Sequence, residues 1–382
     1  MISTREVQET ARNLGVTTAT IERDYVLGWL LWGIYTNPLL AQNLILKGGN
    51  CLRKVYFPQT RFSDDLDFST TNGLDVGALF HEQLNQVCSA VGDRSGIAFD
   101  LQRTRVQEKS TPDADCRALE ARVYFQGHGS GVRRRSVTMR IKFDISEYET
   151  IALPLQAHPL LHPYSDAGAC QARVRTYSLE EVLAEKLRSW IQRTRPRDLY
   201  DIVTIATAEA VPLVRANLLA SFLQKTIYKQ VPLAGRDEML YPGKFTDITR
   251  HWGPSITCPG PRLDVRAAIA HFYGFIDDLF TDAAAREPAG STDHLYNVAS
   301  GIREAIIAAG REKKLVRVRY AEQERDVEPY SFRFKRRDGR EMEYFYGFDR
   351  TRGQRIKSFF LHKIAGVSIL PTAYQPRWDV EF

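Results

Sequence analysis

Residues 43–70, NLILKGGNCLRKVYFPQTRFSDDLDFST, constrain the fold of this chain more than any other stretch. The pattern predicts, in order, a short apolar strand at Leu44–Leu46, a tight turn at Gly48 and Gly49, a short helix at Asn50–Phe57 and a strand at Phe62–Ser69. Pro58 ends the helix because proline lacks a backbone N–H donor. We therefore expect an α+β fold built on a mixed sheet.

Two carboxylates lie one residue apart on the second of these strands, at Asp65 and Asp67. Side chains at i and i+2 share a face of a strand, with Cβ atoms about 6–7 Å apart. Both carboxylates can then reach a pair of divalent ions about 3.5–4 Å apart. Phosphoryl transfer uses such a clamp because negative charge builds on the attacking and leaving oxygens.

A third carboxylate is expected on a neighbouring strand, and RIKFDIS (140–146) supplies Asp144. Lys142 and Ser146 would share its face of that strand. The third acid acts as general base on the attacking hydroxyl or as another metal ligand. The predicted metal ligands are therefore Asp65, Asp67 and Asp144, with Mg²⁺ or Mn²⁺ as cofactor and a nucleoside triphosphate (NTP) as substrate.

The turn after the first strand is the predicted triphosphate site, formed by Lys47, Gly48, Gly49 and Asn50. Backbone N–H groups at a glycine turn and at a helix N-terminus suit phosphate oxygens, and glycine permits close approach. Taken singly, an Asp-x-Asp pair is commonly a solvated strand edge and a Gly-Gly turn only a turn. Their order along the chain, together with Asp144, favours a nucleotidyltransferase site.

The remaining chain divides by pattern. Residues 78–93 favour a helix, and residues 96–151 favour strands at GIAFDLQRT, ARVYFQG and SVTMRIKFDIS. Residues 178–207 favour a helix that starts with a capping box at Ser178 and Glu181 and is interrupted at Pro196. Residues 208–281 are expected to be mostly helical, with an irregular patch at Tyr241–Pro261. A helix at Asn297–Lys314 and strands with a hairpin turn at Asp338–Gly339 follow.

The N-terminal stretch Arg5–Tyr35 admits two interpretations. Gly15 and the segment Thr17–Tyr25 resemble the turn and recognition helix of a helix-turn-helix. The alternative is a pair of packed helices, which is favoured because the following run, Tyr25–Ile34, is too apolar for a DNA-facing surface.

Composition limits the compartment and the partners. The net charge of +6 permits a nucleic-acid partner without requiring one. The five cysteines include no C-x-x-C pair, which argues against a disulfide framework or a zinc ribbon and favours a reducing cytosol. The charged start predicts no signal peptide, and Tyr25–Ile34 is too short to cross a membrane, so we expect a cytoplasmic protein.

These motifs resemble the AbiEii/AbiGii nucleotidyltransferase family of the DNA polymerase β-like superfamily, the toxin half of type IV toxin–antitoxin and abortive-infection (phage-defence) systems. The resemblance covers roughly residues 5–280 and rests on IERDYVLGWLL, LKGGNCLR, RFSDDLDFS, KFDIS and LEEVLAEKLRSWIQR followed by RDLYD. Asn50 stands where the wider superfamily often has Ser or Thr, and the spacing from Gly49 to Asp65 is longer than in minimal members.

The resemblance also implies roles for residues. Ser63, Asp65 and Asp67 would lie at the metal and triphosphate, and Lys186 would contact phosphate. Arg193, two helical turns after Lys186, shares its face, as Asp198 and Asp201 share one face at i and i+3. Asp201 would orient Lys186 or the incoming nucleotide. Without the resemblance, Lys186 and Arg193 fit a solvated amphipathic face with ion pairs.

Residues 315–370 resemble a WYL domain, a small SH3-like β-barrel that often binds nucleic acid or nucleotides. The resemblance rests on VEPYSF (327–332), EYFYGFD (343–349) and RIKSFFLHKI (355–364), with Glu343 at the tryptophan position of the signature. Cations could hold phosphates there while rings stack bases; otherwise the segment is a solvated barrel exterior over an aromatic core. The candidates are Arg333, Lys335, Arg350, Arg352, Arg355, Lys357, Tyr330, Tyr344 and Tyr346.

We therefore expect a nucleotidyltransferase core at 1–207, its helical half at 208–281, a linker at 282–295 and a WYL-like domain at 296–382. The predicted activity is transfer of a nucleoside monophosphate from an NTP to RNA, such as the tRNA 3′ end, with an antitoxin protein as partner. Two alternatives stay open: a nucleic-acid-binding regulator with an idle catalytic domain, and a nucleotidyltransferase that modifies protein hydroxyls.

Overall fold

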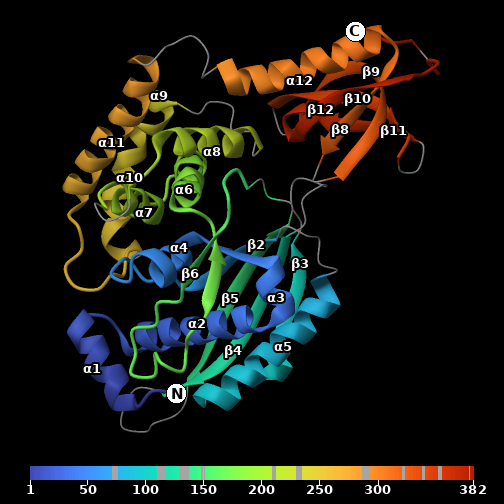
Figure 1. Ribbon diagram of the computed structural model, residues 1–382. Coiled ribbons are helices and arrows are strands. Elements are labelled where there is room, and N and C mark those ends of the chain that lie inside the picture. The colour runs from blue at the N-terminus through green and yellow to red at the C-terminus, as the bar shows by residue number, and fades with distance from the viewer. Residues whose placement is uncertain are drawn as a thin grey trace. The chain divides into compact units, whose positions relative to one another are not determined.

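The computed structural model describes residues 1–70, 76–109, 118–128, 137–147, 149, 151–208, 212–228, 235–285, 293–320, 323–337, 340–351, 355–377 and 379–382. The chain divides into two compact units (Figure 1). The first unit comprises Met1–Phe222 and Gly235–Leu279, and the second comprises Leu223–Ala234 and Phe280–Phe382.

A mixed sheet forms the centre of the first unit, in the order β3-β4-β5-β2-β1-β7-β6. Its strands are β1 (Leu44–Lys47), β2 (Asp65–Thr70), β3 (Arg105–Lys109), β4 (Ala118–Gly127), β5 (Val137–Glu147), β6 (Gln156–Pro159) and β7 (Arg173–Thr176). The β5–β2 and β1–β7 pairs are parallel and the other pairs are antiparallel. The α+β class with a mixed sheet is therefore confirmed.

Helices cover one face of this sheet. They are α2 (Thr18–Thr36), α3 (Pro38–Asn43) and α5 (Val76–Ser95); α2 packs against α5 and β5, and α1 (Thr4–Leu14) packs on α2 (Figure 1). On β5, Ile141, Phe143 and Ile145 are buried under them, whereas the alternate residues point to the opposite, open face. The predicted site residues of β2 and β5 belong to that open face.

Most of α2 is interior, which favours the interpretation of α1 and α2 as packed helices. Ile21, Tyr25 and the whole run Val26–Leu31 are buried, and α1 ends at Gly15, whose φ of +68° is a left-handed cap. A recognition helix would have to leave one face free for a DNA groove.

The helical half of the first unit follows β7. Its elements are α6 (Leu179–Arg193), α7 (Pro196–Ala206), α8 (Arg215–Tyr228), α9 (Arg236–Met239), α10 (Gly243–Ser255) and α11 (Val265–Ala285). The predicted cap at Ser178 is present, with its hydroxyl accepting from the Glu181 N–H, and Pro196 occupies the first turn of α7.

Several predicted elements were wrong or displaced. The patch 241–261 was expected to be irregular but contains α10, which is held by Phe245 and Trp252 in the core. The predicted strand at 96–104 is reduced to a single antiparallel bridge between Phe99 and Phe125 of β4, and a 3₁₀ turn, Leu101–Arg103, follows it before β3. The helix after the glycine turn starts earlier than predicted, as α4 (Gly48–Cys51), and continues as a π-helical turn, Leu52–Tyr56. Strand β2 starts at Asp65, three residues later than predicted.

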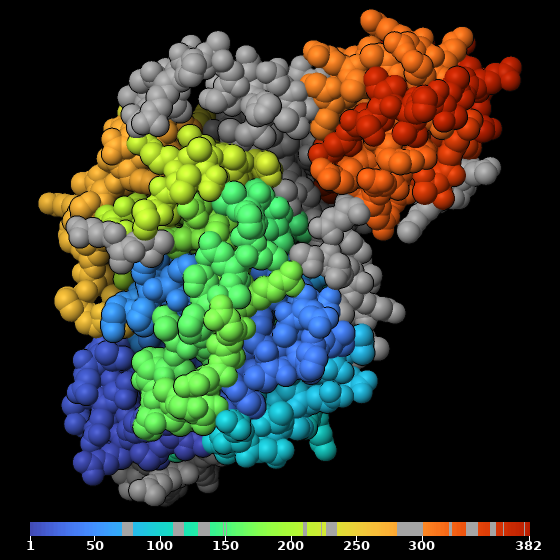
Figure 2. All heavy atoms as spheres, viewed as in Figure 1, coloured from blue at the N-terminus to red at the C-terminus, as the bar shows by residue number. Residues whose placement is uncertain are grey.

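A buried ion cluster fixes that π-helical turn. Asp24 on α2 accepts from Arg53 Nε at 2.7 Å and Lys54 Nζ at 2.8 Å, and from the Tyr164 hydroxyl at 2.7 Å. Burial alone would raise the pKa of Asp24, but Lys54 and Arg53 outweigh it and lower the pKa to about 2. Tyr164 belongs to the segment 151–177, part of which lies on the surface of the first unit (Figure 2).

The second unit carries a five-stranded antiparallel sheet and one long helix, α12 (Asp293–Arg311). Its strands are β8 (Lys314–Tyr320), β9 (Gln323–Arg337), β10 (Arg340–Asp349), β11 (Arg355–Phe360) and β12 (Ile364–Ala373), in the order β11-β10-β9-β8-β12. Ile306 of α12 packs with Val316, Phe345 and Phe359 in its core. The hairpin dipeptide Asp338–Gly339 lies outside the described residues, although Arg337 and Arg340 pair beside it.

Among the helices that the structure describes, none is both long and apolar enough to cross a membrane.

Candidate active site

The three predicted carboxylates are brought together on the open face of the sheet. Asp65 and Asp67 share that face of β2, and the parallel register sets Asp67 beside Asp144 and Asp65 beside Lys142 of β5. Neighbouring strands are about 4.8 Å apart. Asp67 and Asp144 are thus neighbours across the β2–β5 pair. Asp65 lies two residues from Asp67 on the same face of β2.

These acids differ in their electrostatics. Burial raises the pKa of Asp67 to about 6, against the attraction of Lys47 and Lys186 and with added repulsion from Asp144 and Asp65. Burial likewise raises the pKa of Asp65. Asp144 is opposite: burial would raise its pKa, but hydrogen bonds from Lys109 and Lys142, each at 2.5 Å, lower it. Negative charge is therefore least compensated at Asp67 and Asp65.

The glycine turn at Gly48 and Gly49 lies directly against the carboxylate site. Gly48 has a φ of +73°, and a Cβ atom there would lie 2.2 Å from Asp67 Oδ2. A Cβ on Gly49 would lie 2.8 Å from both Arg61 NH2 and Ser63 Oγ. Only glycine permits these approaches, so the turn holds the backbone N–H groups of the α4 N-terminus against the carboxylate site.

Asn50 and Ser63 lie on the two sides of that turn. Asn50 is fully buried, and its Nδ2 donates to the Asp65 carbonyl at 2.6 Å and the Ser63 carbonyl at 3.3 Å. The side chain therefore fixes the loop that leads into β2, a structural role that sequence reasoning did not assign. Ser63 is partly exposed beside Gly49.

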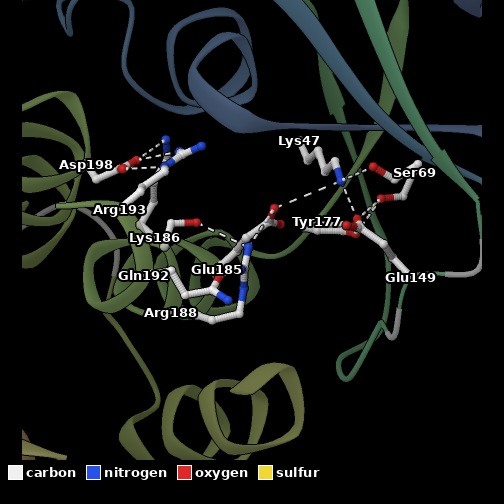
Figure 3. Close-up of polar contacts among 12 residues, drawn as sticks. Lys47, Ser69, Glu149, Tyr177, Glu185, Lys186, Arg188, Gln192, Arg193 and Asp198 are labelled. Carbon is white, nitrogen blue, oxygen red and sulfur yellow. Dashed lines mark hydrogen bonds and ion pairs between the residues drawn. The ribbon is translucent and has the colours of Figure 1, made fainter. Parts of the chain in front are cut away.

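Lys47 ends β1 directly across from Asp67. Its ammonium group contacts Ser146 Oγ at 3.2 Å, forms an ion pair with Glu149 and lies 3.9 Å from Glu185 of α6 (Figure 3). Glu149 also accepts from Ser69 Oγ at 2.7 Å. Lys47 is thus held among carboxylates of three segments at one edge of the site.

The helix pair α6–α7 brings the other predicted cations to the site. Lys186 Nζ lies 2.8 Å from Asp201 Oδ2 and 3.4 Å from Asp198 Oδ1, and Arg193 makes a two-pronged ion pair with Asp198 at 2.8 and 3.0 Å (Figure 3). The charges of Lys186 and Arg193 are felt at Asp67. Arg193 keeps 46% of its side chain exposed, so it can reach a ligand.

A buried arginine that the sequence interpretation passed over joins these helices to the loop before β2. Arg61 Nε and NH2 donate to the two oxygens of Asp201 at 2.8 and 2.7 Å, with both side chains almost fully buried. Asp201 therefore serves as the common partner of Arg61 and the buried Lys186. Arg61 stands in the quoted motif RFSDDLDFS, but nothing in the motif indicates its partner 140 residues later. Lys109, Glu149 and Glu185 were also missed, because no motif marks them.

The donor set fits divalent ions in chemistry, since three carboxylates offer hard oxygen ligands. The surplus negative charge at Asp67, whose pKa is raised, is what a bound cation would neutralise. Among the described residues, however, no three His, Cys, Asp or Glu side chains are arranged ready to hold an ion. The two oxygens of Asp144 are paired with Lys109 and Lys142.

The geometry agrees with a comparison against protein families. The model described as "Nucleotidyl transferase AbiEii toxin, Type IV TA system" matches residues 29–257, more than half of the chain. The chain belongs to this family. AbiEii membership makes the protein a nucleotidyltransferase of the toxin type, and the matched residues include the glycine turn, all three carboxylates, α6 and α7.

Solved structures show partial likeness to this AbiEii protein. MenT4, a nucleotidyltransferase toxin from Mycobacterium tuberculosis, is 19% identical with a TM-score of 0.48, covering 76% of this chain and 97% of MenT4. A candidate nucleotidyltransferase from H. pylori is 15% identical with a TM-score of 0.43, covering 71% of this chain and 99% of its own. No curated protein matches the sequence.

The candidate ligand residues of the second unit are mostly engaged. Tyr330 and Tyr344 are buried, so their rings belong to the core and are not free to stack on bases. Arg350 pairs at 2.6 Å with Glu328, a fully buried acid that also accepts from the Tyr330 hydroxyl. Arg333 pairs with Glu381, Lys357 lies 5.6 Å from the Phe359 ring, and Tyr346 is partly exposed. The side chains of Lys335, Arg352 and Arg355 lie outside the described residues.

Proposed function

We propose that this AbiEii protein transfers a nucleoside monophosphate from an NTP to an RNA acceptor, such as the 3′ end of tRNA, as the toxin of a type IV toxin–antitoxin pair. The observation that carries the proposal is the register of β2 and β5, which sets Asp67 beside Asp144 within contact of the Gly48 turn. The proposed reaction forms a bond between the acceptor hydroxyl oxygen and the α-phosphorus. It breaks the bond from the α-phosphorus to the oxygen that leaves with pyrophosphate.

Each residue has a defined part in this proposal. The N–H groups at Gly48 and Gly49 bind triphosphate oxygens, and Lys186 and Arg193 neutralise the phosphate charge. Asp144 takes the proton of the acceptor hydroxyl once Lys109 and Lys142 no longer occupy its two oxygens. Arg61 and Asp201 position Lys186 without touching the substrate.

Asp65, Asp67 and Asp144 would hold Mg²⁺ or Mn²⁺. When bound, the ions supply positive charge to the reacting phosphate and lower the charge repulsion among the three acids. Lys109 and Lys142 would then release Asp144, since the ions replace their charge.

Two further parts of the proposal concern partners. An antitoxin protein is implied by the type IV family of the chain. The second unit is proposed as a WYL-like sensor of nucleic acid or another ligand, supported by an antiparallel sheet whose exposed side chains include Arg333 and Arg350.

The test is incubation of the protein with each α-labelled NTP, Mg²⁺ and total tRNA. We expect labelled tRNA from the native protein and none from Asp65→Ala/Asp67→Ala. The matched control is Asp247→Ala, which removes an exposed acid from α10 and should leave labelling unchanged. Full activity in the double variant would refute the carboxylate assignment.

The same assay identifies the acceptor molecule by where the label appears. Label on protein, with tRNA unlabelled, would replace the RNA acceptor by a protein hydroxyl. NTP bound tightly with no label on any acceptor would contradict the proposed transfer and favour the regulator with an idle catalytic domain.

A further inference from the structure

A cavity opens on the opposite side of the carboxylate strand from the glycine turn. It has a volume of about 730 Å³ and is lined by the start of α2, by Asp64 and Asp65, and by β4 and β5. The wall residues are Thr18, Ala19, Glu22, Arg23, Asp64, Asp65, Tyr124, Thr138, Met139 and Arg140. This volume falls in the range of about 300–1,000 Å³ that holds small organic ligands.

The strand order separates this cavity from the triphosphate site. In the sequence β4-β5-β2-β1, the glycine turn follows β1 on one side of β2, whereas Tyr124 and Arg140 lie on β4 and β5 on the other. Asp65 contributes to both the cavity and the carboxylate site, since it lines the cavity and lies on the same face of β2 as Asp67. A molecule in the cavity therefore meets the carboxylates from the side away from the triphosphate.

Two residues of the cavity wall, Arg140 and Tyr124, have the charge and the ring that bind single-stranded nucleic acid. Arg140 stands beside Tyr124 in the β4–β5 register and makes no ion pair with another residue that the structure describes. The guanidinium of Arg103 already stacks on the Tyr124 ring at 4.3 Å. A base can extend such a stack, and a phosphate can lie on the arginine.

The acids Glu22 and Asp64 of the cavity wall are held by partners of their own. The carboxylate of Glu22 accepts from the backbone N–H and Nδ1 of His128, at 2.7 and 2.9 Å, and so is turned to its own partner. Asp64 is paired with Arg23 at 2.7 Å. The first turn of the 19-residue helix α2 adds N–H groups near Thr18 and Ala19, which favour an anion.

We infer that this cavity is the acceptor subsite and that it takes the 3′-terminal nucleotides of a single RNA strand, with the phosphate at Arg140 and a base at Tyr124. The terminal hydroxyl then reaches Asp65 and Asp144, opposite the triphosphate. The inference rests on the proposed function, because it names where the acceptor of that reaction binds. Transfer itself follows the bond changes given above, with the hydroxyl proton passing to Asp144.

Substitutions of Arg140 and Tyr124 should change RNA binding in different ways. Arg140→Ala should weaken binding of a fluorescent RNA oligonucleotide with a free 3′ end, and should reduce the slope of log affinity against log salt by about 0.7, the loss of one phosphate contact. Tyr124→Ala should weaken binding about 5- to 150-fold while leaving the slope unchanged, since stacking carries no charge. Arg140→Lys should restore the slope and Tyr124→Phe the affinity.

Binding is measured by fluorescence anisotropy, with Arg250→Ala as the matched control for loss of an exposed arginine. Affinity for NTP should be unchanged in every variant, which also shows that each is folded. Equal RNA affinity in Arg140→Ala and the native protein would overturn the inference, as would a native protein that binds no RNA or that labels only protein. If the variants lose RNA binding but the native protein transfers nothing, the subsite stands and the proposed reaction fails.

Discussion

The ionised carboxylate of Asp67 is expected to destabilise the folded protein, although the proposed reaction requires that carboxylate. Its pKa is raised from 3.8 to about 6, mainly by burial, so the ionised carboxylate is disfavoured in the folded state. At 1.36 kcal/mol per pKa unit this is about 3 kcal/mol, an upper bound because the side chain is only partly buried. Asp67→Asn, which removes the charge and keeps the shape, should therefore raise the free energy of unfolding by about 1–3 kcal/mol at pH 7 while abolishing transfer.

The pH dependence gives the sign of the effect. Below pH 4 the carboxyl is protonated in both the folded and the unfolded states, so the variant should have little advantage. Between pH 4 and 6 the unfolded state ionises first, and the native protein loses stability relative to the variant. Above pH 6 the difference should be constant. A difference that grew as the pH fell would contradict the raised pKa.

Urea unfolding in EDTA measures this difference through tryptophan fluorescence, because four of the five tryptophans lie in the first unit. Asp144→Asn is the matched control: its pKa is lowered and it accepts from two lysines, so this variant should be destabilised. Adding Mg²⁺ should stabilise the native protein and not Asp67→Asn. An Asp67→Asn protein that is less stable than the native one in EDTA would refute the reasoning.

Three other substitutions test neighbouring features. Arg61→Ala should lower the free energy of unfolding by about 3–5 kcal/mol, since it leaves a buried carboxylate short of its two-pronged partner; a loss below 1 kcal/mol in urea titration would contradict this. Gly48→Ala should abolish transfer and destabilise strongly, because its Cβ would meet a carboxylate oxygen at 2.2 Å, whereas Gly15→Ala, also at positive φ but in open space, should cost only about 1–2 kcal/mol. Lys186→Met should weaken NTP binding at least about tenfold by calorimetry, the loss of one charge-assisted hydrogen bond; unchanged affinity would remove Lys186 from the phosphate site.

The parts of the fold that sequence could predict are those with strong local signals. The alternating pattern of residues 136–146 specifies β5, and the serine cap and Pro196 mark the starts of α6 and α7. The strands β6 and β7 were missed because each has only four residues, and β7 depends on pairing with β1, far away in sequence. Helix α10 was missed because its glycines and Pro254 conceal an apolar face that only the core makes visible.

The candidate site divides in the same way. The acids and the glycine turn are close in sequence or lie in strands with clear alternation, so their approach follows from sheet geometry. The pairing of Arg61 with Asp201, or of Lys47 with Glu149, depends on how loops and helices pack over the sheet, and no periodicity encodes that. The pKa of Asp67 is raised mainly by burial, and that of Asp144 is lowered by Lys109 of β3 and Lys142 of its own strand; of these causes, sequence could place only Lys142 beside Asp144.

The long span between Arg61 and Asp201 has a consequence for the order of synthesis. The ribosome makes Arg61, which lies just before the carboxylate strand, 140 residues before its partner Asp201. At about 5–20 residues per second this is a delay of roughly 7–28 s. During that interval the nascent chain displays its acids without the helices that hold Lys186 and Arg193 over them. If these cations act at the acids as proposed, the nascent chain has no complete site until α7 has been made.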